Sequence, residues 1–123
     1  MKTIYAFIIL SFTLLSCDFE SEGILRNKSN NTLIFKVKGG NIDGFYKNAV
    51  LESKNNNQYI YILKSNTYER LFFAFNDEVT ANKISFDELE IISGEDTTVF
   101  SGKESIFQQF KKKSKHTYEF VID

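Results

Sequence analysis

Apolar and polar residues alternate along much of this chain. In the segment 32–38, Leu33, Phe35 and Val37 occupy every second position, and they alternate with Thr32, Ile34, Lys36 and Lys38. A period of two is typical of a β-strand with one buried face. Runs of similar length predict further strands, and the expected set covers 32–38, 48–53, 58–64, 68–75, 83–86, 89–93, 97–101 and 116–123. In the segment 58–64 both parities are rich in apolar residues, so we expect that strand to be covered on both faces.

Turn-forming residues separate these runs. The sequence Gly39-Gly40-Asn41 ends the first strand, and the polar residues 54–57 form a predicted hairpin loop. Seven or eight short strands at this spacing predict an antiparallel β-sandwich, or a barrel. A chain of 123 residues has room for one such domain.

The segment near residues 102–113 shows a helical pattern instead. Ser101 and Glu104 have the spacing of a capping box, and Ile106, Phe107 and Phe110 recur at helical intervals. We therefore expect one short helix, with Lys111, Lys112 and Lys113 at its carboxyl end, where positive charge suits the helix dipole. The lysine run has two interpretations, a solvated helix end and a contact with anionic lipid.

The first seventeen residues follow the pattern of a secretory signal peptide. Lys2 gives a positive start, and Thr3–Leu15 is a mostly apolar run of 13 residues. That run is too short for a transmembrane helix, which needs about 20 residues. The sequence Leu14-Leu15-Ser16-Cys17 resembles the lipobox of bacterial lipoproteins, in which an apolar residue stands three positions before the cysteine and a small residue stands just before it. Leu15 is bulkier than the usual residue at its position.

The lipobox resemblance implies that residues 1–16 are a signal peptide cleaved between Ser16 and Cys17. It also implies that Cys17 carries a diacylglycerol thioether, and that its newly exposed amine can take a further acyl chain such as palmitate. Cys17 is the single cysteine of the chain, so it has no partner for an intramolecular disulfide. Two or more acyl chains give stable anchoring, so the expected partner is a membrane.

The cysteine is followed by a polar stretch that contains three acidic residues. We expect residues 17–23 to be the lipidated cysteine and an acidic tether, at most about 20 Å long when extended, and residues 24–123 to be a single β-rich domain. Asp18 alone resembles the inner-membrane retention signal of enteric bacteria. Asp18, Glu20 and Glu22 together resemble the surface-export signal of Bacteroidota lipoproteins, and the Asn- and Lys-rich, proline-free chain favours this outer-membrane address. A merely solvated linker is the ordinary alternative.

The charged and reactive residues give no sign of catalysis or of nucleic-acid binding. The 15 basic and 16 acidic residues leave no basic surplus for phosphates. The only cysteine is committed to lipid, His116 is the only histidine, and no serine lies in a G-x-S-x-G turn. We therefore expect a protein that is not an enzyme, with no catalytic residues and no cofactor.

Metal binding has little support either. Zinc sites draw on several Cys or His ligands, which the chain does not offer. Calcium needs only oxygen ligands, so a calcium ion between loops stays open, although no carboxylates have EF-hand spacing. The candidate calcium ligands are Asp77, Glu78, Asp87, Glu88, Glu90, Glu95 and Asp96, and solvated turn carboxylates are their ordinary interpretation.

The layout of the whole chain resembles that of small all-β lipoproteins of Bacteroidota. Because that resemblance has no diagnostic motif, it implies no active site. We expect a non-catalytic binding or scaffolding module of the cell envelope, which binds through loops or a strand edge. Phe45 and Tyr46 are candidate contact residues beside the Gly-rich turn, unless they belong to the core. The alternatives are an inhibitor or immunity-type lipoprotein that blocks a toxin or lytic enzyme, and a small hydrolase.

Overall fold

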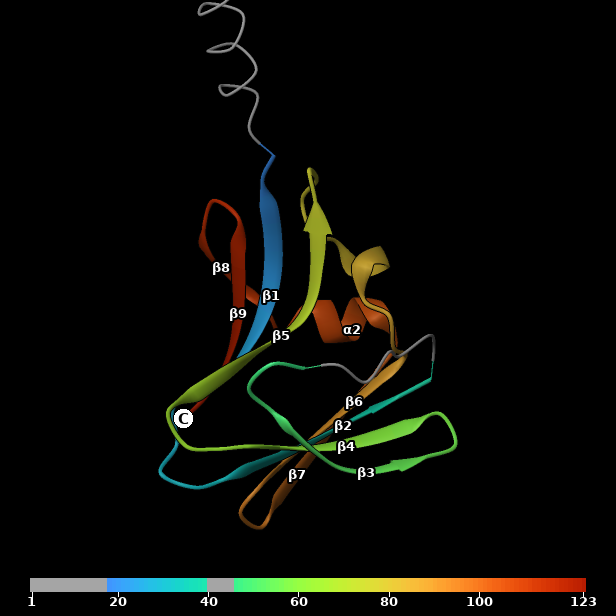
Figure 1. The fold of residues 1–123 in the computed structure, drawn as a ribbon, viewed down its shortest axis with the longest axis vertical. Coiled ribbons are helices and arrows are strands. Elements are labelled where there is room, and N and C mark those ends of the chain that lie inside the picture. The colour runs from blue at the N-terminus through green and yellow to red at the C-terminus, as the bar shows by residue number, and fades with distance from the viewer. Residues whose placement is uncertain (1–17, 40–45) are drawn as a thin grey trace, which may run out of the picture.

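The computed structural model describes residues 18–39 and 46–123, which fold into two β-sheets with one short α-helix (Figure 1). The first sheet, sheet A, has the strand order β5-β1-β9-β8, and the second, sheet B, has the order β3-β4-β2-β6-β7. This arrangement confirms the predicted mostly-β, sandwich-like fold. The described residues form nine strands, one or two more than the pattern predicted.

The strands of each sheet come from distant parts of the chain. Sheet A consists of β1 (Glu20–Asn27), β5 (Thr67–Phe75), β8 (Lys111–Ser114) and β9 (Thr117–Ile122). Sheet B consists of β2 (Leu33–Lys38), β3 (Val50–Asn55), β4 (Gln58–Leu63), β6 (Glu88–Ser93) and β7 (Asp96–Ser101). All strand pairs in these residues are antiparallel except β1 and β9, which run parallel with Leu25 opposite Phe120.

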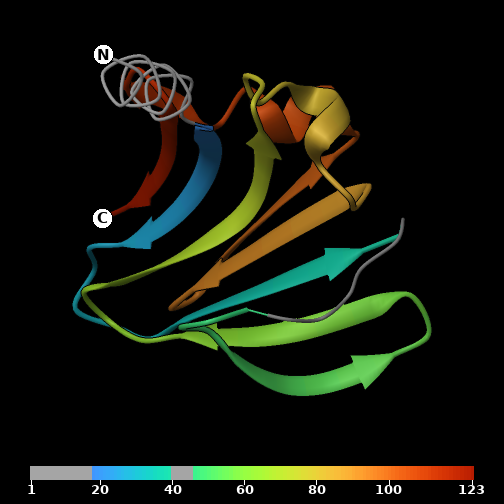
Figure 2. The same ribbon diagram turned by 45° about the horizontal axis from the view of Figure 1, so that its top comes forward.

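The two sheets meet at one corner and diverge from it (Figure 2). At this corner β1 leads into β2, and β4 leads into β5. The fully buried Asn27 joins the two connections, because its side-chain Nδ2 donates to the carbonyl oxygens of Asn31 at 2.9 Å and Leu63 at 3.0 Å. The wider side is filled by a 3₁₀ turn, η1 (Ala81–Lys83), and by the helix α2 (Lys103–Phe107).

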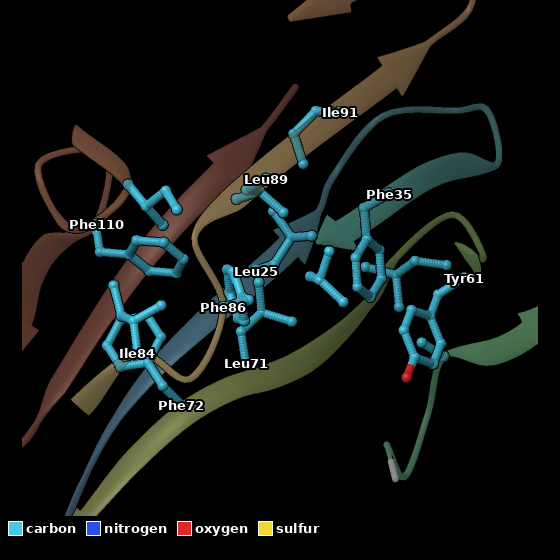
Figure 3. Packing of buried hydrophobic residues seen from close by; sticks show 14 of the residues in the cluster. Leu25, Phe35, Tyr61, Leu71, Phe72, Ile84, Phe86, Leu89, Ile91 and Phe110 are labelled. Carbon is cyan, nitrogen blue, oxygen red and sulfur yellow. The ribbon is translucent and has the colours of Figure 1, made fainter. Parts of the chain in front are cut away.

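The hydrophobic core lies between the sheets, where the inward-facing residues of both meet (Figure 3). Phe35 of β2 stacks on Tyr61 of β4, with ring centroids 5.1 Å apart. Phe72 of β5 meets Phe110, which follows α2, edge-on at 4.8 Å. Side chains that are fully or almost fully buried include Leu25, Leu33, Phe35, Val37, Tyr61, Leu63, Ile84, Phe86, Leu89 and Ile106. Their alternation along the strands explains why the period-two pattern identified most of the sheet.

The amino-terminal segment differs from the prediction of a tether over 17–23. Glu20–Gly23 belong to β1, where they pair with β5 on one side and, from Glu22 onward, with β9 on the other. Gly23 allows the ring of Phe72 to approach the backbone, because a Cβ at this position would lie 2.1 Å from Phe72 Cζ. The first strand therefore begins at Glu20, so residues 20–23 of the predicted tether belong to β1.

The helix and its lysine run also differ from the prediction. A helix is present, but it ends at Phe107, its N-cap is Gly102 and no side chain caps it. Lys111–Ser114 form the edge strand β8 rather than a helix end, because they pair with β9. The predicted strand 83–86 is not a strand: Lys83 ends η1 and 84–86 are irregular chain, although the two apolar residues, Ile84 and Phe86, are fully buried.

Candidate functional site

The outer face of sheet B carries a row of aliphatic side chains. Ile34 of β2 lies opposite Ile62 of β4 and opposite Ile92 of β6, and Ile62 in turn lies opposite Val50 of β3. Residues in register on neighbouring strands point to the same face of a sheet, so these four form one continuous row across four strands. Val50 is 56% exposed, and the three isoleucines are half-buried.

Two further aliphatic residues, on β4 and β7, lie in the next register row of the same face. Ile60 and Lys36 lie opposite each other in the next register row, and Lys36 lies opposite Glu90, which lies opposite Val99. Val99 is 47% exposed and Ile60 is half-buried. We call the six residues the outer patch, and its members are Ile34, Val50, Ile60, Ile62, Ile92 and Val99.

Charged and polar residues lie both within and beside the outer patch, because Lys36 and Glu90 separate Ile60 from Val99. Lys36 Nζ and Glu90 Oε2 form an ion pair at 3.2 Å within the second register row. The third row contains Lys38 with Gln58 on one side and Glu88 on the other. An apolar centre beside a polar margin is the usual anatomy of a protein-binding surface.

The strand β3 forms the outer edge of sheet B beside the patch, and all six of its residues are exposed. A buried carboxylate fixes the start of this strand, because Glu69 Oε1 accepts hydrogen bonds from the backbone N–H groups of Asn48 at 2.6 Å and Ala49 at 2.7 Å. Glu69 belongs to β5 of sheet A and is 3% exposed. One side chain of sheet A therefore holds the entry to the edge strand that contributes Val50.

The predicted contact residues lie elsewhere. Tyr46 is half-buried and packs on the core, with its ring centroid 4.6 Å from that of Tyr61 and 5.9 Å from that of Phe35. Tyr46 therefore packs against the core and is not an exposed contact residue. Phe45 lies outside the described residues.

The lipobox residues Ser16 and Cys17 also lie outside the described residues. Of the three acidic residues after them, Asp18 precedes the first strand, and its Oδ1 accepts a hydrogen bond from Asn76 Nδ2 at 3.0 Å. Glu20 and Glu22 belong to β1, and both approach Arg70 Nη1, at 3.1 and 3.9 Å. Only Asp18 among them lies ahead of the folded strands.

His116 lies in the turn between β8 and β9. Its Nδ1 is 3.2 Å from Glu78 Oε1, and its ring stacks on Phe19 with centroids 4.5 Å apart. Neither contact brings a hydroxyl or thiol nucleophile to the imidazole. The pair has the carboxylate and the base of a catalytic triad but not the third group that nucleophilic catalysis requires.

The carboxylates that the sequence offered as calcium ligands are dispersed. Asp77 and Glu78 follow β5, Asp87 precedes β6, and Asp96 begins β7. Within residues 18–39 and 46–123, no three Asp, Glu, His or Cys side chains are grouped so that they could hold a metal ion. Asp77 and Glu90 form ion pairs with lysines at 3.6 and 3.2 Å.

Sequence reasoning missed the outer patch. It placed Ile34 with the polar parity of its strand, and it interpreted Ile60 and Ile62 as the second buried face of theirs. The structure leaves these isoleucines half-exposed, so the strand β4 is not covered on both faces by the described residues. The available signal was the recurrence of an aliphatic residue on the otherwise polar parity of β2, β4 and β6.

In the described part of the chain, no helix is long and apolar enough to cross a membrane. No protein-family model, curated protein sequence or solved structure matches this chain.

Proposed function

We propose that this protein is a lipid-anchored, non-catalytic binding module of the bacterial cell envelope, and that it binds a protein partner through the outer patch of sheet B. The observation that carries the binding role is the in-register row of Val50, Ile62, Ile34 and Ile92 on a solvent-facing sheet surface. An aliphatic row this wide favours association, because covering it removes apolar area from water.

The anchoring role is supported by the sequence Leu14-Leu15-Ser16-Cys17, and by the position of the fold relative to it. The strand β1 begins at Glu20, three residues after the cysteine that would carry the lipid. Sheet B lies at the opposite end of the molecule from the start of β1 (Figure 1). A partner would therefore reach the outer patch on the side that faces away from the membrane.

A protein partner fits the patch better than a small ligand does. The row is spread across a sheet face of four neighbouring strands, and the Lys36–Glu90 ion pair lies at its side. Small-molecule sites are concave and enclose most of their ligand, whereas protein interfaces are broad with an apolar centre and a charged rim.

Site-specific photo-crosslinking in cells tests the binding role. Val50 is replaced by benzoylphenylalanine, and Tyr68, which is 44% exposed on the outer face of sheet A, receives the same replacement as the matched control. We expect a discrete crosslinked protein from position 50 that is missing from position 68. Mass spectrometry identifies it. Equal crosslinking from both positions, or none from position 50, would contradict the proposed surface.

The identity of the crosslinked protein separates the possible roles. A structural envelope protein would indicate scaffolding, and a second copy of this chain would indicate self-association through sheet B. A hydrolase or toxin whose activity is lost on binding would make the module an inhibitor.

The anchor and its address have tests of their own. Cys17→Ala is expected to abolish acyl labelling and to leave uncleaved precursor, whereas a cleaved but unlabelled wild-type protein would refute lipidation. Protease added to intact cells is expected to remove the domain if Asp18, Glu20 and Glu22 act as a surface-export signal. Protection until the cells are lysed would place the domain in the periplasm instead.

A further inference from the structure

The end of the domain at which β1 begins has little freedom relative to Cys17. Asp18 and Phe19 are the only residues between the cysteine and Glu20, and both are held by Asn76 at the end of β5. Phe19 N donates to Asn76 Oδ1 at 3.0 Å, and Asn76 N donates to Phe19 O at 2.8 Å. Three residues of extended chain span at most about 11 Å, so a lipid on Cys17 would keep this end within that distance.

Large aromatic side chains are exposed at the same end. Phe75 is 58% exposed and lies opposite Glu20, the first residue of β1. Phe19, just before β1, is 37% exposed, whereas Phe73, 48% exposed one register row further along the same outer face, has Arg70 Cζ 4.2 Å from its ring centroid. Exposed Phe rings at this density are costly in water, and they are favourable where a protein surface enters the boundary between headgroups and acyl chains.

Two lysines without an ion-pair partner among the described residues lie at the same end of sheet A. The hairpin between β8 and β9 turns at the level where Thr117 pairs with Glu22, so Lys113 and Lys115 lie at this end of sheet A (Figure 1). Both lysines are exposed, and neither forms an ion pair with any described residue.

Most acidic groups at this end, in contrast, have basic partners. Arg70 lies 3.1 Å from Glu20 and 3.9 Å from Glu22, and Lys83 lies 3.6 Å from Asp77. The acidic groups are therefore partly neutralised within the fold, whereas the hairpin lysines remain available for an outside anion.

We propose that this end, which we call the tether face (Phe19, Phe75, Lys113 and Lys115), lies directly on the bilayer that holds the Cys17 lipid. The aromatic rings enter the interface, and the two lysines contact anionic phospholipid headgroups. The inference rests on the proposed lipid anchor. It adds that the domain has a fixed orientation, with sheet A toward the membrane and the outer patch of sheet B away from it.

A single tryptophan can report this contact, because the chain has none of its own. The full-length, lipidated Phe75→Trp variant is reconstituted into vesicles of phosphatidylcholine and phosphatidylglycerol that contain lipids with brominated acyl chains. The matched control is Val99→Trp, whose position is 47% exposed on the outer face of sheet B. We expect blue-shifted emission and several-fold stronger bromine quenching for Phe75→Trp than for Val99→Trp.

Vesicle flotation of the same samples distinguishes failure of the anchor from failure of the contact. Protein that floats while the two variants are quenched equally would overturn the tether face and leave the anchor intact. Protein that does not float would overturn the anchor and this inference with it. Adding Lys113→Glu and Lys115→Glu is expected to reduce the Phe75→Trp quenching in phosphatidylglycerol vesicles, and unchanged quenching would overturn the role of the lysines.

Discussion

The outer faces of the two sheets differ in what surrounds their exposed apolar side chains. On sheet A, exposed aromatic rings are covered by arginines, with Arg70 Cζ 4.2 Å from the ring centroid of Phe73 and Arg26 Cζ 4.9 Å from that of Tyr68. Both arginines also form ion pairs with glutamates on neighbouring strands. On sheet B, Ile34 has an isoleucine in register on each neighbouring strand, Ile62 and Ile92.

This difference affects the desolvation cost of covering each face with a protein partner. Covering the outer face of sheet A would desolvate arginines and glutamates that are already paired, and buried ion pairs do not reliably repay that cost. Covering the outer patch of sheet B would desolvate mainly methyl and methylene groups, which is favourable. This difference supports the proposals of partner binding through sheet B and of membrane contact at the one end of sheet A whose lysines lack partners within the described residues.

The largest expected effect is on the free energy of unfolding, and it differs between substitutions on the two faces of β2. Phe35→Ala is expected to lower the free energy of unfolding by about 3 to 5 kcal/mol, because it leaves a cavity beside Tyr61 in the core. Ile34→Ala, one residue earlier and half-buried, is expected to cost less than half as much. Urea unfolding of the segment 18–123, followed by circular dichroism, measures both. Equal losses would mean that the outer face of sheet B is part of the structural core, not a binding surface.

Replacing two aliphatic residues of sheet B with an oppositely charged pair tests the comparison of the two outer faces. Ile34→Arg together with Ile92→Glu gives the centre of the outer patch a cross-strand ion pair like those of sheet A, because the two positions lie in register. We expect partner affinity to fall by about 2 kcal/mol, or roughly 30-fold, as for a central interface residue. The measurement is the crosslinking yield from benzoylphenylalanine at position 50. A retained yield would show that the aliphatic row is not the contact.

The sequence predicted the fold class and most of the core because alternation reports burial directly. It could not predict β1, whose residues 20–23 are mostly polar or glycine and become a strand only through pairing with β5 and β9, distant in sequence. It also assigned Lys111, Lys112 and Lys113 to a helix end, because the spacing of Ile106, Phe107 and Phe110 predicts a helix that continues beyond Phe107. In the structure, the helix ends at Phe107 and Lys111–Ser114 form β8. Long-range pairing overrides local pattern at both places.

The candidate sites also differ in whether they depend on a local motif or on long-range strand pairing. The proposed lipobox is a local motif, so the sequence alone can suggest it. The outer patch combines residues of β2, β3, β4, β6 and β7, and its continuity depends on strand order and register, which no single segment encodes. The tether face requires the ends of β1, β5 and β9 to coincide, which again depends on the parallel pairing of the first and last strands.

A smaller effect is expected on the outer face of sheet A. Arg26→Met keeps much of the side-chain length but removes the ion pair with Glu119, whose side chain is only 10% exposed. We expect a loss of about 1 to 2 kcal/mol, because an almost buried carboxylate is left without its partner. A double-mutant cycle with Glu119→Gln in urea unfolding isolates the pair, and a coupling energy near zero would show that the ion pair does not hold this face together.

The smallest effect is expected at Arg70, whose contacts are more exposed. Its side chain is 38% exposed, and its partners Glu20 and Glu22 are 49% and 31% exposed. Arg70→Gln is therefore expected to cost less than about 1 kcal/mol, and molar salt should remove most of that cost by screening the ion pairs. Urea unfolding at low and high salt measures this change. A cost that persists in high salt would assign it to the stacking of Arg70 on Phe73, because a cation–π contact at 4.2 Å involves partly dehydrated groups. In that case Phe73→Leu should reproduce the loss, and the outer face of sheet A would resemble sheet B more closely in what stabilises it.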